Sequence, residues 1–225
     1  MGKLLAQSIL GFIFLMLVLG LALFLSAGTV SYWQAWVYLA VWTACVLPIT
    51  IYLFLKDPGL LSSRVKAGPV SETRKSQQVI QSFASLFFIL LYIIAGLDQR
   101  FHWSTVPPIL SIISDLFVAL GFYFVFLVFK ENTYTSATIE VADSQKVIST
   151  GPYSIVRHPM YAGAFLLLLF TPTALGSWVA LPFPIPLILV IVVRLLDEEK
   201  FLSAHLDGYT AYLQKVHYRL IPYIW

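Results

Sequence analysis

Long stretches without a charged side chain dominate the pattern of this chain. Residues 4–55, 76–97 and 158–193 contain no Asp, Glu, Lys or Arg. A helix needs roughly 20 predominantly apolar residues to cross the hydrocarbon core of a bilayer. The first run is long enough for two crossings and the second for one. The pattern therefore predicts an all-α, polytopic integral membrane protein.

Polar breaks divide these runs into separate helices. Gly28-Thr29 interrupts the first run, and Lys56-Asp57-Pro58-Gly59 ends it with a charge pair and two helix breakers. We expect a polar loop over residues 56–78. The predicted spans cover residues 4–25, 33–55, 81–97 and 109–129. Asp115 is the one charged residue inside the fourth span, and its place near the predicted outer end favours the membrane interface over an ion pathway.

The run 158–193 is too long for one crossing and marginal for two. Lys and Arg collect on the cytoplasmic side of membrane proteins, so their distribution decides between the two topologies. Six crossings with both termini inside place every one of the 14 basic residues except Arg100 on the inner face. A single crossing would move all basic residues from Arg194 onward to the outside. We therefore expect a short helical hairpin over residues 160–196 and about six spans.

The tail of the chain has a different pattern. Apolar residues recur there at spacings of three, four and seven, which is the period of a helix with one apolar face. They are Leu195, Leu202, Leu206, Tyr209, Leu213 and Val216. The pattern predicts an amphipathic helix over residues 194–216 that lies at the cytoplasmic interface.

The composition agrees with a membrane protein and narrows its chemistry. Hydrophobic residues make up 59% of the chain, charged residues only 11%, and the mean hydropathy is +0.84. A soluble domain carries about 25% charged residues. Cys45 is the only cysteine, which excludes an intramolecular disulfide and a cysteine-based metal site. His205 and His217 have no third ligand nearby in the sequence, so we expect no metal, and a net charge of +3 gives no reason to expect a nucleic-acid partner.

Polar residues gather in the loop 130–161 and the segment 194–200. The predicted topology brings both to the cytoplasmic membrane surface. Pro152 and Pro159 fix the backbone φ angle at two points of the loop, which favours a shaped loop that leads into a helix. Arg194 and Glu198 stand four residues apart and share a helix face. They are candidates for ligand binding, or they form a plain ion pair along the helix.

Two patterns in these segments resemble the core of the isoprenylcysteine carboxyl methyltransferases and their prokaryotic relatives. The first is Thr150-Gly151-Pro152-Tyr153 followed by Val156-Arg157-His158-Pro159-Met160-Tyr161-Ala162-Gly163. The second is Arg194-x-x-x-Glu198-Glu199-x-x-Leu202, then Tyr209-x-x-Tyr212 and Leu220-Ile221-Pro222. The resemblance covers about residues 117–225. It divides the chain into N-terminal transmembrane helices over 1–108 and a methyltransferase core over 109–225.

The resemblance implies a membrane enzyme that uses S-adenosylmethionine without a Rossmann domain. In agreement, no two of the 12 glycines are separated by a single residue, so the G-x-G-x-x-G fingerprint is absent. The family's cofactor pocket corresponds here to Gln145, Lys146, Val147, Ile148, Tyr153, His158, Pro159, Met160, Tyr161 and Glu198. Family members often have His at the position of Gln145. The resemblance also implies Arg194 and Glu199 as catalytic residues, and Arg194 and Arg157 as substrate-binding residues.

The chemistry of methyl transfer suits these residue types. Glu198 can bind the amino group of the cofactor, and His158 with backbone N–H groups can bind its carboxylate. A tyrosine face beside the sulfonium gives a cation–π contact worth about 0.5–2 kcal/mol. A carboxylate acceptor is already ionised at neutral pH and needs no general base. Arg194 can hold such an acceptor through two parallel hydrogen bonds, and alignment is then the main requirement.

Three other functions remain open at this point. A phospholipid N-methyltransferase would share the fold, the cofactor and the His-Pro-x-Tyr and Glu-Glu elements. An NADPH-dependent membrane reductase of the sterol type has a distantly similar Arg-His-x-x-Tyr turn. A transporter or channel is disfavoured, because the charges gather at one face and not within the spans. The leading prediction is carboxyl methylation of a lipophilic or lipid-modified substrate, with membrane lipids as the surroundings.

Overall fold

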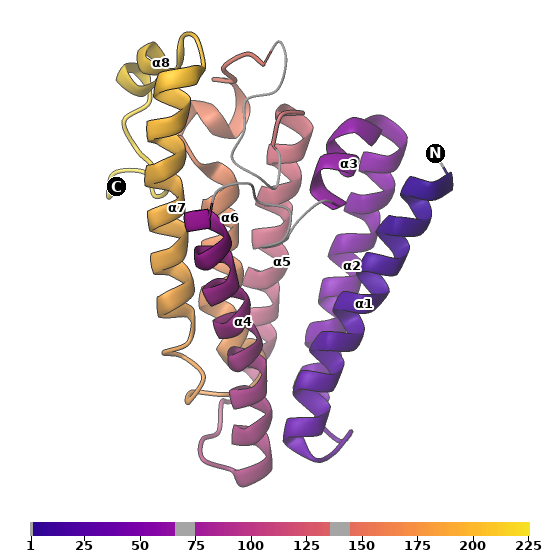
Figure 1. The fold of residues 1–225 in the computed structure, drawn as a ribbon. Coiled ribbons are helices and arrows are strands. Elements are labelled where there is room, and N and C mark those ends of the chain that lie inside the picture. Colours follow the sequence, from indigo (N-terminus) through magenta and orange to yellow (C-terminus); the bar gives the residue numbers. More distant parts are fainter. Residues whose placement is uncertain (1, 66–74, 136–144) are drawn as a thin grey trace.

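The computed structural model describes residues 2–65, 75–135 and 145–225, and every regular element within them is helical. This confirms the all-α prediction. The helices are α1 (Gly2–Ala27), α2 (Trp33–Lys56), α3 (Pro58–Val65), α4 (Lys75–Phe101), α5 (Pro108–Glu131), the 3₁₀ turn η2 (Gly151–Ser154), α6 (Pro159–Ala174), α7 (Pro184–His205) and α8 (Tyr209–Lys215). The long helices run roughly side by side, with α3 and α8 at the same end of the bundle (Figure 1).

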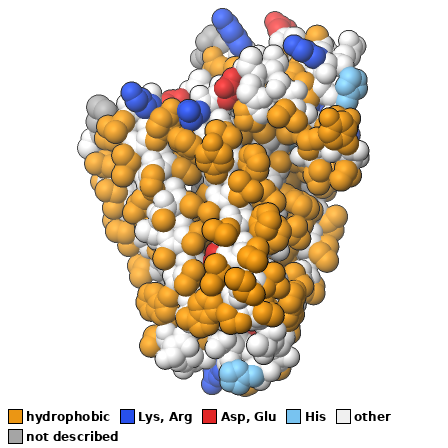
Figure 2. Space-filling view, turned by 180° about the vertical axis from the view of Figure 1, so that it is seen from behind, with side chains coloured by type: hydrophobic (Ala, Val, Ile, Leu, Met, Phe, Trp, Pro, Cys, Tyr) orange, Lys and Arg blue, Asp and Glu red, His pale blue; other side chains and the backbone are white. Residues whose placement is uncertain are grey.

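The protein is a multi-pass integral membrane protein. Helices α1, α2, α4 and α5 are each long and apolar enough to cross a bilayer, and α6 is a shorter apolar helix. Large apolar side chains such as Phe14, Leu25 and Ile51 are exposed along these helices. Figure 2 shows apolar side chains covering the middle of one face, while most Lys and Arg side chains on it lie at one end. A surface of this kind is stable in lipid rather than in water.

Prolines fix where several helices begin. Pro108, Pro159 and Pro184 each stand at the start of a helix, namely α5, α6 and α7. Proline suits this position because its missing N–H would have no helical partner there and its φ angle is already helical. Pro159 therefore ends the loop at His158 and begins α6 with Met160 and Tyr161 in its first turn.

Two glycines bring α5 and α6 into close contact. A Cβ atom on Gly121 would lie 2.9 Å from the carbonyl oxygen of Gly163, and one on Gly163 would lie 2.9 Å from the carbonyl oxygen of Gly121. No larger residue fits at either position without moving a backbone. The contact holds the first turn of α6, which carries Tyr161, at a fixed distance from α5.

Buried hydroxyl groups join the helices in the interior. The Tyr38 hydroxyl lies 2.7 Å from the Tyr92 hydroxyl and 2.9 Å from that of Thr171, which links α2, α4 and α6. Asp115 is also directed inward, with only 4% of its surface exposed. The face of α5 that carries Asp115 packs against the other helices, and the placement of Asp115 near the membrane interface stays a prediction.

Two predicted boundaries are wrong. The loop predicted over 56–78 contains α3 and the start of α4; the Asp57 carboxylate accepts the Leu60 N–H at 2.9 Å and so caps α3. The single helix predicted over 194–216 is divided, because α7 continues to His205 and α8 begins only at Tyr209. Gly208 separates them with a φ of +83°, a left-handed conformation that glycine adopts readily.

Candidate functional site

A cavity of about 870 Å³, partly open to solvent, lies at the end of the bundle that carries α8. It is enclosed by the segment after α5, by η2, by the start of α6 and by the last turns of α7 with α8. Its lining residues are Asn132, Tyr134, Thr135, Gln145, Lys146, Val147, Ile148, Tyr153, Arg157, His158, Pro159, Met160, Tyr161, Arg194, Glu198, Leu202, Leu206, Tyr209 and Tyr212. All ten predicted cofactor residues, and both predicted substrate arginines, are among them.

Tyr161 connects the two charged residues of α7 in this cavity. Its hydroxyl donates a hydrogen bond to Glu198 Oε2 at 2.8 Å and accepts one from Arg194 Nε at 3.2 Å. Glu198 and Arg194 lie on the same face of α7, and the first turn of α6 places Tyr161 against that face. One hydroxyl group therefore fixes the carboxylate and the guanidinium relative to each other.

Gln77 of α4 is a further partner of Arg194. Its side-chain carbonyl accepts a hydrogen bond from Arg194 Nη1 at 3.2 Å, and its amide nitrogen donates to Asp197 Oδ2 at 2.6 Å. Gln77 is 1% exposed. Gln77 falls at the end of the segment that the sequence predicts as a polar loop, and nothing in the sequence pairs position 77 with position 194.

Tyr153 is held from two sides. Its hydroxyl accepts a hydrogen bond from Asn132 at 2.9 Å, and its backbone carbonyl accepts one from the Tyr212 hydroxyl at 2.8 Å. Burial raises the pKa of Tyr153 well above the usual tyrosine value, although the hydrogen bond from Asn132 opposes this in part. The phenol therefore stays neutral at any physiological pH and offers the cavity an aromatic face and a fixed hydroxyl.

Glu199 faces away from the cavity lining. Its Oε1 lies 3.1 Å from Arg157 Nη1 and 3.3 Å from His158 Nε2, and its Oε2 lies 3.0 Å from Arg219 Nε. Burial alone would raise the pKa of the Glu199 carboxyl, but the contacts with His158 and Arg219 and the charge of Arg157 hold it below the ordinary value. This geometry favours a positioning role for Glu199 over the catalytic role expected from the sequence.

Glu199 forms an ion cluster with Arg157, His158 and Arg219, and this cluster limits the contacts that Arg157 can make with a ligand. One of its terminal nitrogens contacts Glu199 and the other donates to the backbone carbonyl of His217 at 3.2 Å. Its Nε is buried without a hydrogen-bond partner among the described residues. Arg157 lines the cavity, but its guanidinium is largely committed to the protein. It therefore suits a fixed positive charge better than a mobile substrate ligand.

The last residues of the chain support the loop before α6. The backbone N–H groups of Arg157 and His158 donate to the carbonyls of Tyr218 and Arg219 at 2.9 and 3.0 Å. Arg219 then reaches Glu199 with its side chain. Leu220-Ile221-Pro222 belonged to the sequence pattern, but the role of Arg219 was not predicted, because it depends on a contact with residues some 60 positions earlier in the chain.

Seven further residues line the cavity without having been predicted as site residues. Leu202, Tyr209 and Tyr212 stood in the sequence pattern, but no cavity role was predicted for them. The other cavity residues without a predicted role are Asn132, Tyr134, Thr135 and Leu206. Leu206, Tyr209, Tyr212 and Val216 form a buried apolar cluster. Partly buried Val147 and Tyr153 pack against that cluster. The apolar stripe predicted for the tail therefore exists, but it closes the cavity.

Comparison with known proteins agrees with this site. Residues 109–207 match the family described as phospholipid methyltransferase, so the chain carries a membrane methyltransferase domain of that family. Methyltransferases of this family use S-adenosylmethionine, which is the cofactor of this protein. No curated protein matches the chain. The match supports methyl transfer over the NADPH-dependent reductase that the Arg-His-x-x-Tyr turn left open.

The residues that line the cavity fit S-adenosylmethionine. The lining combines a carboxylate for an ammonium group, cationic and N–H groups for a carboxylate, and aromatic and aliphatic side chains for an adenosine. Within residues 2–65, 75–135 and 145–225, no group of three or more His, Cys, Asp or Glu side chains is placed to bind a metal ion.

Proposed function

We propose that this protein transfers the methyl group of S-adenosylmethionine to a carboxylate on a lipophilic, isoprenylcysteine-like acceptor in the membrane. The observation that carries the proposal is the Glu198–Tyr161–Arg194 arrangement in the wall of the cavity. It sets a carboxylate suited to the cofactor beside a guanidinium suited to an anionic acceptor. A two-substrate enzyme needs such adjacent sites.

On the cofactor side, Glu198 binds the amino group and the ion cluster around Glu199 serves the carboxylate. That cluster contains two arginines against one glutamate, so it carries a net positive charge even with His158 neutral. Arg157 and His158 of this cluster both line the cavity and would supply its contacts. Tyr153, Val147 and Ile148 supply aromatic and apolar surface for the adenosine.

On the acceptor side, Arg194 orients the carboxylate. A guanidinium has five N–H donors, so it can keep its hydrogen bonds to Tyr161 and Gln77 while binding an acceptor oxygen. The bound cofactor supplies a methyl group activated by a positive sulfonium. Because a carboxylate is ionised at neutral pH, the protein needs to align it and exclude water but not to remove a proton.

A second candidate is N-methylation of a phospholipid amine, which the family match favours. Arg194 would then bind the lipid phosphate, since a guanidinium matches a phosphate as well as a carboxylate. The amine must lose a proton before attack, which adds a requirement for a base. For that reason we place carboxyl methylation first.

The test is transfer of labelled methyl from S-adenosylmethionine by the purified protein in nanodiscs. A farnesylated cysteine and phosphatidylethanolamine are supplied as separate acceptors, and products are split into base-labile and base-stable label. Carboxyl methylation predicts base-labile label on the farnesylated cysteine, because esters hydrolyse in base. Base-stable label on phosphatidylethanolamine would instead support the phospholipid amine. No transfer to either acceptor would contradict both.

A further inference from the structure

Gln77 is a buried polar residue in a helix that lies outside the matched family domain. It stands in the first turn of α4, is 1% exposed, and both ends of its amide are hydrogen-bonded. A buried amide without hydrogen-bond partners is destabilising, so the two hydrogen bonds are needed for Gln77 to be buried here. Its partners, Arg194 and Asp197, both belong to α7, and α4 packs directly against α7.

The two hydrogen bonds of Gln77 constrain the orientation of Arg194. Tyr161 holds the guanidinium at Nε and Gln77 holds it at Nη1, so two different edges of the planar group are fixed by two different helices. Asp197 in turn fixes which end of the Gln77 amide faces Arg194, because only the NH₂ end can donate to a carboxylate. The Tyr161 hydroxyl and the Gln77 amide therefore orient the guanidinium from two sides.

We infer that Gln77 is a positioning residue that aims Arg194 at the anionic group of the acceptor, so that α4 takes part in acceptor selection. The inference rests on the proposed function, because it requires an acceptor that carries a carboxylate or a phosphate. It adds a determinant of acceptor binding from outside residues 109–207. Cofactor binding, which depends on Glu198 and the loop before α6, is not expected to involve Gln77.

A second arginine supports an anionic ligand at this place. Arg64 of α3 stacks on Phe129, with its Cζ atom 5.3 Å from the ring centroid. Burial lowers the pKa of Arg64, and the nearby charge of Arg194 lowers it further. An anionic group of the acceptor would be attracted by the charges of both arginines. Arg64, Gln77 and Arg194 thus converge from α3, α4 and α7.

The experiment compares Gln77→Met and Gln77→Glu with the wild type in nanodiscs. Methionine keeps the size of the side chain and removes both hydrogen bonds, whereas glutamate adds a negative charge beside Arg194. Gln99→Met is the matched control, since it makes the same change at the opposite end of the same helix. The measurements are KM and kcat for farnesylated cysteine and phosphatidylethanolamine, and the Kd for S-adenosylhomocysteine.

We expect Gln77→Met to raise the acceptor KM about tenfold, because it removes a hydrogen bond to a charged group, and Gln77→Glu to raise it further, because it adds a negative charge beside Arg194. The Kd for S-adenosylhomocysteine stays within about twofold of the wild type in both variants. Gln99→Met leaves all three quantities unchanged. An unchanged KM in Gln77→Glu, or a loss of cofactor affinity equal to the loss of acceptor affinity, overturns the inference.

A binding measurement separates this inference from the proposed function. Dodecyl phosphate is titrated into the protein saturated with S-adenosylhomocysteine, and dodecanol corrects for partition into the bilayer. Stronger binding of the phosphate to wild type than to Gln77→Glu supports the arginine site even if neither acceptor is methylated. Equal binding by the two proteins overturns it even if methyl transfer is observed.

Discussion

Tyr161 illustrates how one residue can serve both halves of a two-substrate site. Its hydroxyl donates to Glu198 and accepts from Arg194, so it uses its donor and an acceptor on two different side chains. Replacing it disturbs both neighbours at once, whereas replacing Glu198 or Arg194 disturbs only one. The same residue lies in the first turn of α6, so its position depends on how that helix packs against α5.

Tyr161→Phe is expected to weaken both cofactor binding and methyl transfer. The variant keeps the aromatic ring and loses two hydrogen bonds to charged groups, which corresponds to about a tenfold loss in each quantity. Titration with S-adenosylhomocysteine and an assay of labelled methyl transfer measure the two effects. Tyr123→Phe, at an exposed tyrosine of α5 away from this cavity, is the control. A variant that binds the cofactor normally would show that the Tyr161 hydroxyl does not organise Glu198.

The Glu199 carboxylate is expected to make stability depend on pH. Its pKa is lowered in the folded protein, so its contribution is fully present above the ordinary glutamate pKa of 4.5 and is lost as pH falls through the lower folded-state value. Glu199→Gln should lower the melting temperature at pH 7. The melting temperature of this variant should also fall less than that of the wild type as the pH is lowered. Thermal unfolding of detergent-purified protein at several pH values measures this. Asp207→Asn, at an exposed acid, is the control; equal behaviour of the two variants would contradict the buried ion cluster.

The residues that sequence reasoning found are those that lie close together in the chain. Tyr153, His158, Met160 and Tyr161 come from one short segment, and their shared place in the cavity follows once Pro159 begins a helix. Gln77 and Arg219 were not found, because their roles depend on contacts with α7 that join distant parts of the chain. Gln77 also fell within the segment predicted as a polar loop, where a glutamine gives no sign of a buried contact.

At the scale of the helices, small and restricted residues determine the geometry. Prolines begin α5, α6 and α7, and the glycine pair between α5 and α6 sets their separation. The sequence marks these prolines and glycines as helix breakers, but it does not show which residues they contact. Helix ends were predicted less well, because they also depend on contacts that the sequence does not show. Gly208 lies in the break that divides the predicted tail helix, and Asp57 caps α3 within a segment predicted as a loop.

Gly163→Ala is expected to destabilise the protein. The added methyl group would lie 2.9 Å from the carbonyl oxygen of Gly121, so α5 and α6 must separate, at a cost of about 1–3 kcal/mol. The helix propensity gained by replacing glycine offsets about 1 kcal/mol of this. Thermal unfolding in detergent measures the net effect.

Gly11→Ala in α1 is the matched control, because no atom lies within 4 Å of the added methyl group. We expect this variant to be as stable as the wild type or slightly more stable. If Gly163→Ala behaves in the same way, α5 and α6 are not packed through their glycines.

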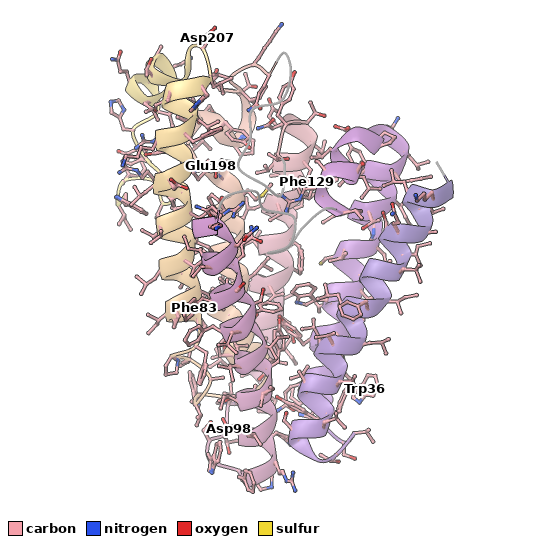
Figure 3. All side chains as sticks on the ribbon, viewed as in Figure 1. Trp36, Phe83, Asp98, Phe129, Glu198 and Asp207 are labelled. Atoms are coloured by element: carbon pink, nitrogen blue, oxygen red, sulfur yellow. The ribbon has the colours of Figure 1, made fainter. Side chains whose placement is uncertain are left out.

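At the scale of the whole molecule, the charges define two unequal ends. Figure 3 shows Glu198 towards one end and Asp98 towards the other. The cavity, α3 and α8 lie at the first end, and Arg100 lies at the second, beside the turn at Gly28. Since basic residues collect on the cytoplasmic side, we propose that the cavity opens toward the cytoplasm.

Single cysteines test this orientation. In a Cys45→Ser background, Lys200→Cys lies at the cavity end and Thr105→Cys at the opposite end, and both replaced residues are exposed. In intact cells, a membrane-impermeant thiol reagent is expected to label Thr105→Cys and not Lys200→Cys. After the cells are opened, both should react. Labelling of Lys200→Cys in intact cells would reverse the proposed orientation.

We propose that the loop before α6 and the charged turn of α7 together enclose one cofactor beside one acceptor. Isothermal titration of S-adenosylhomocysteine into wild type, Glu198→Gln and Arg194→Ala tests it most directly. We expect Glu198→Gln to bind at least about tenfold more weakly, since it loses a charge-assisted contact. Arg194→Ala should keep wild-type affinity while losing methyl transfer. Undiminished affinity in Glu198→Gln would contradict the claim.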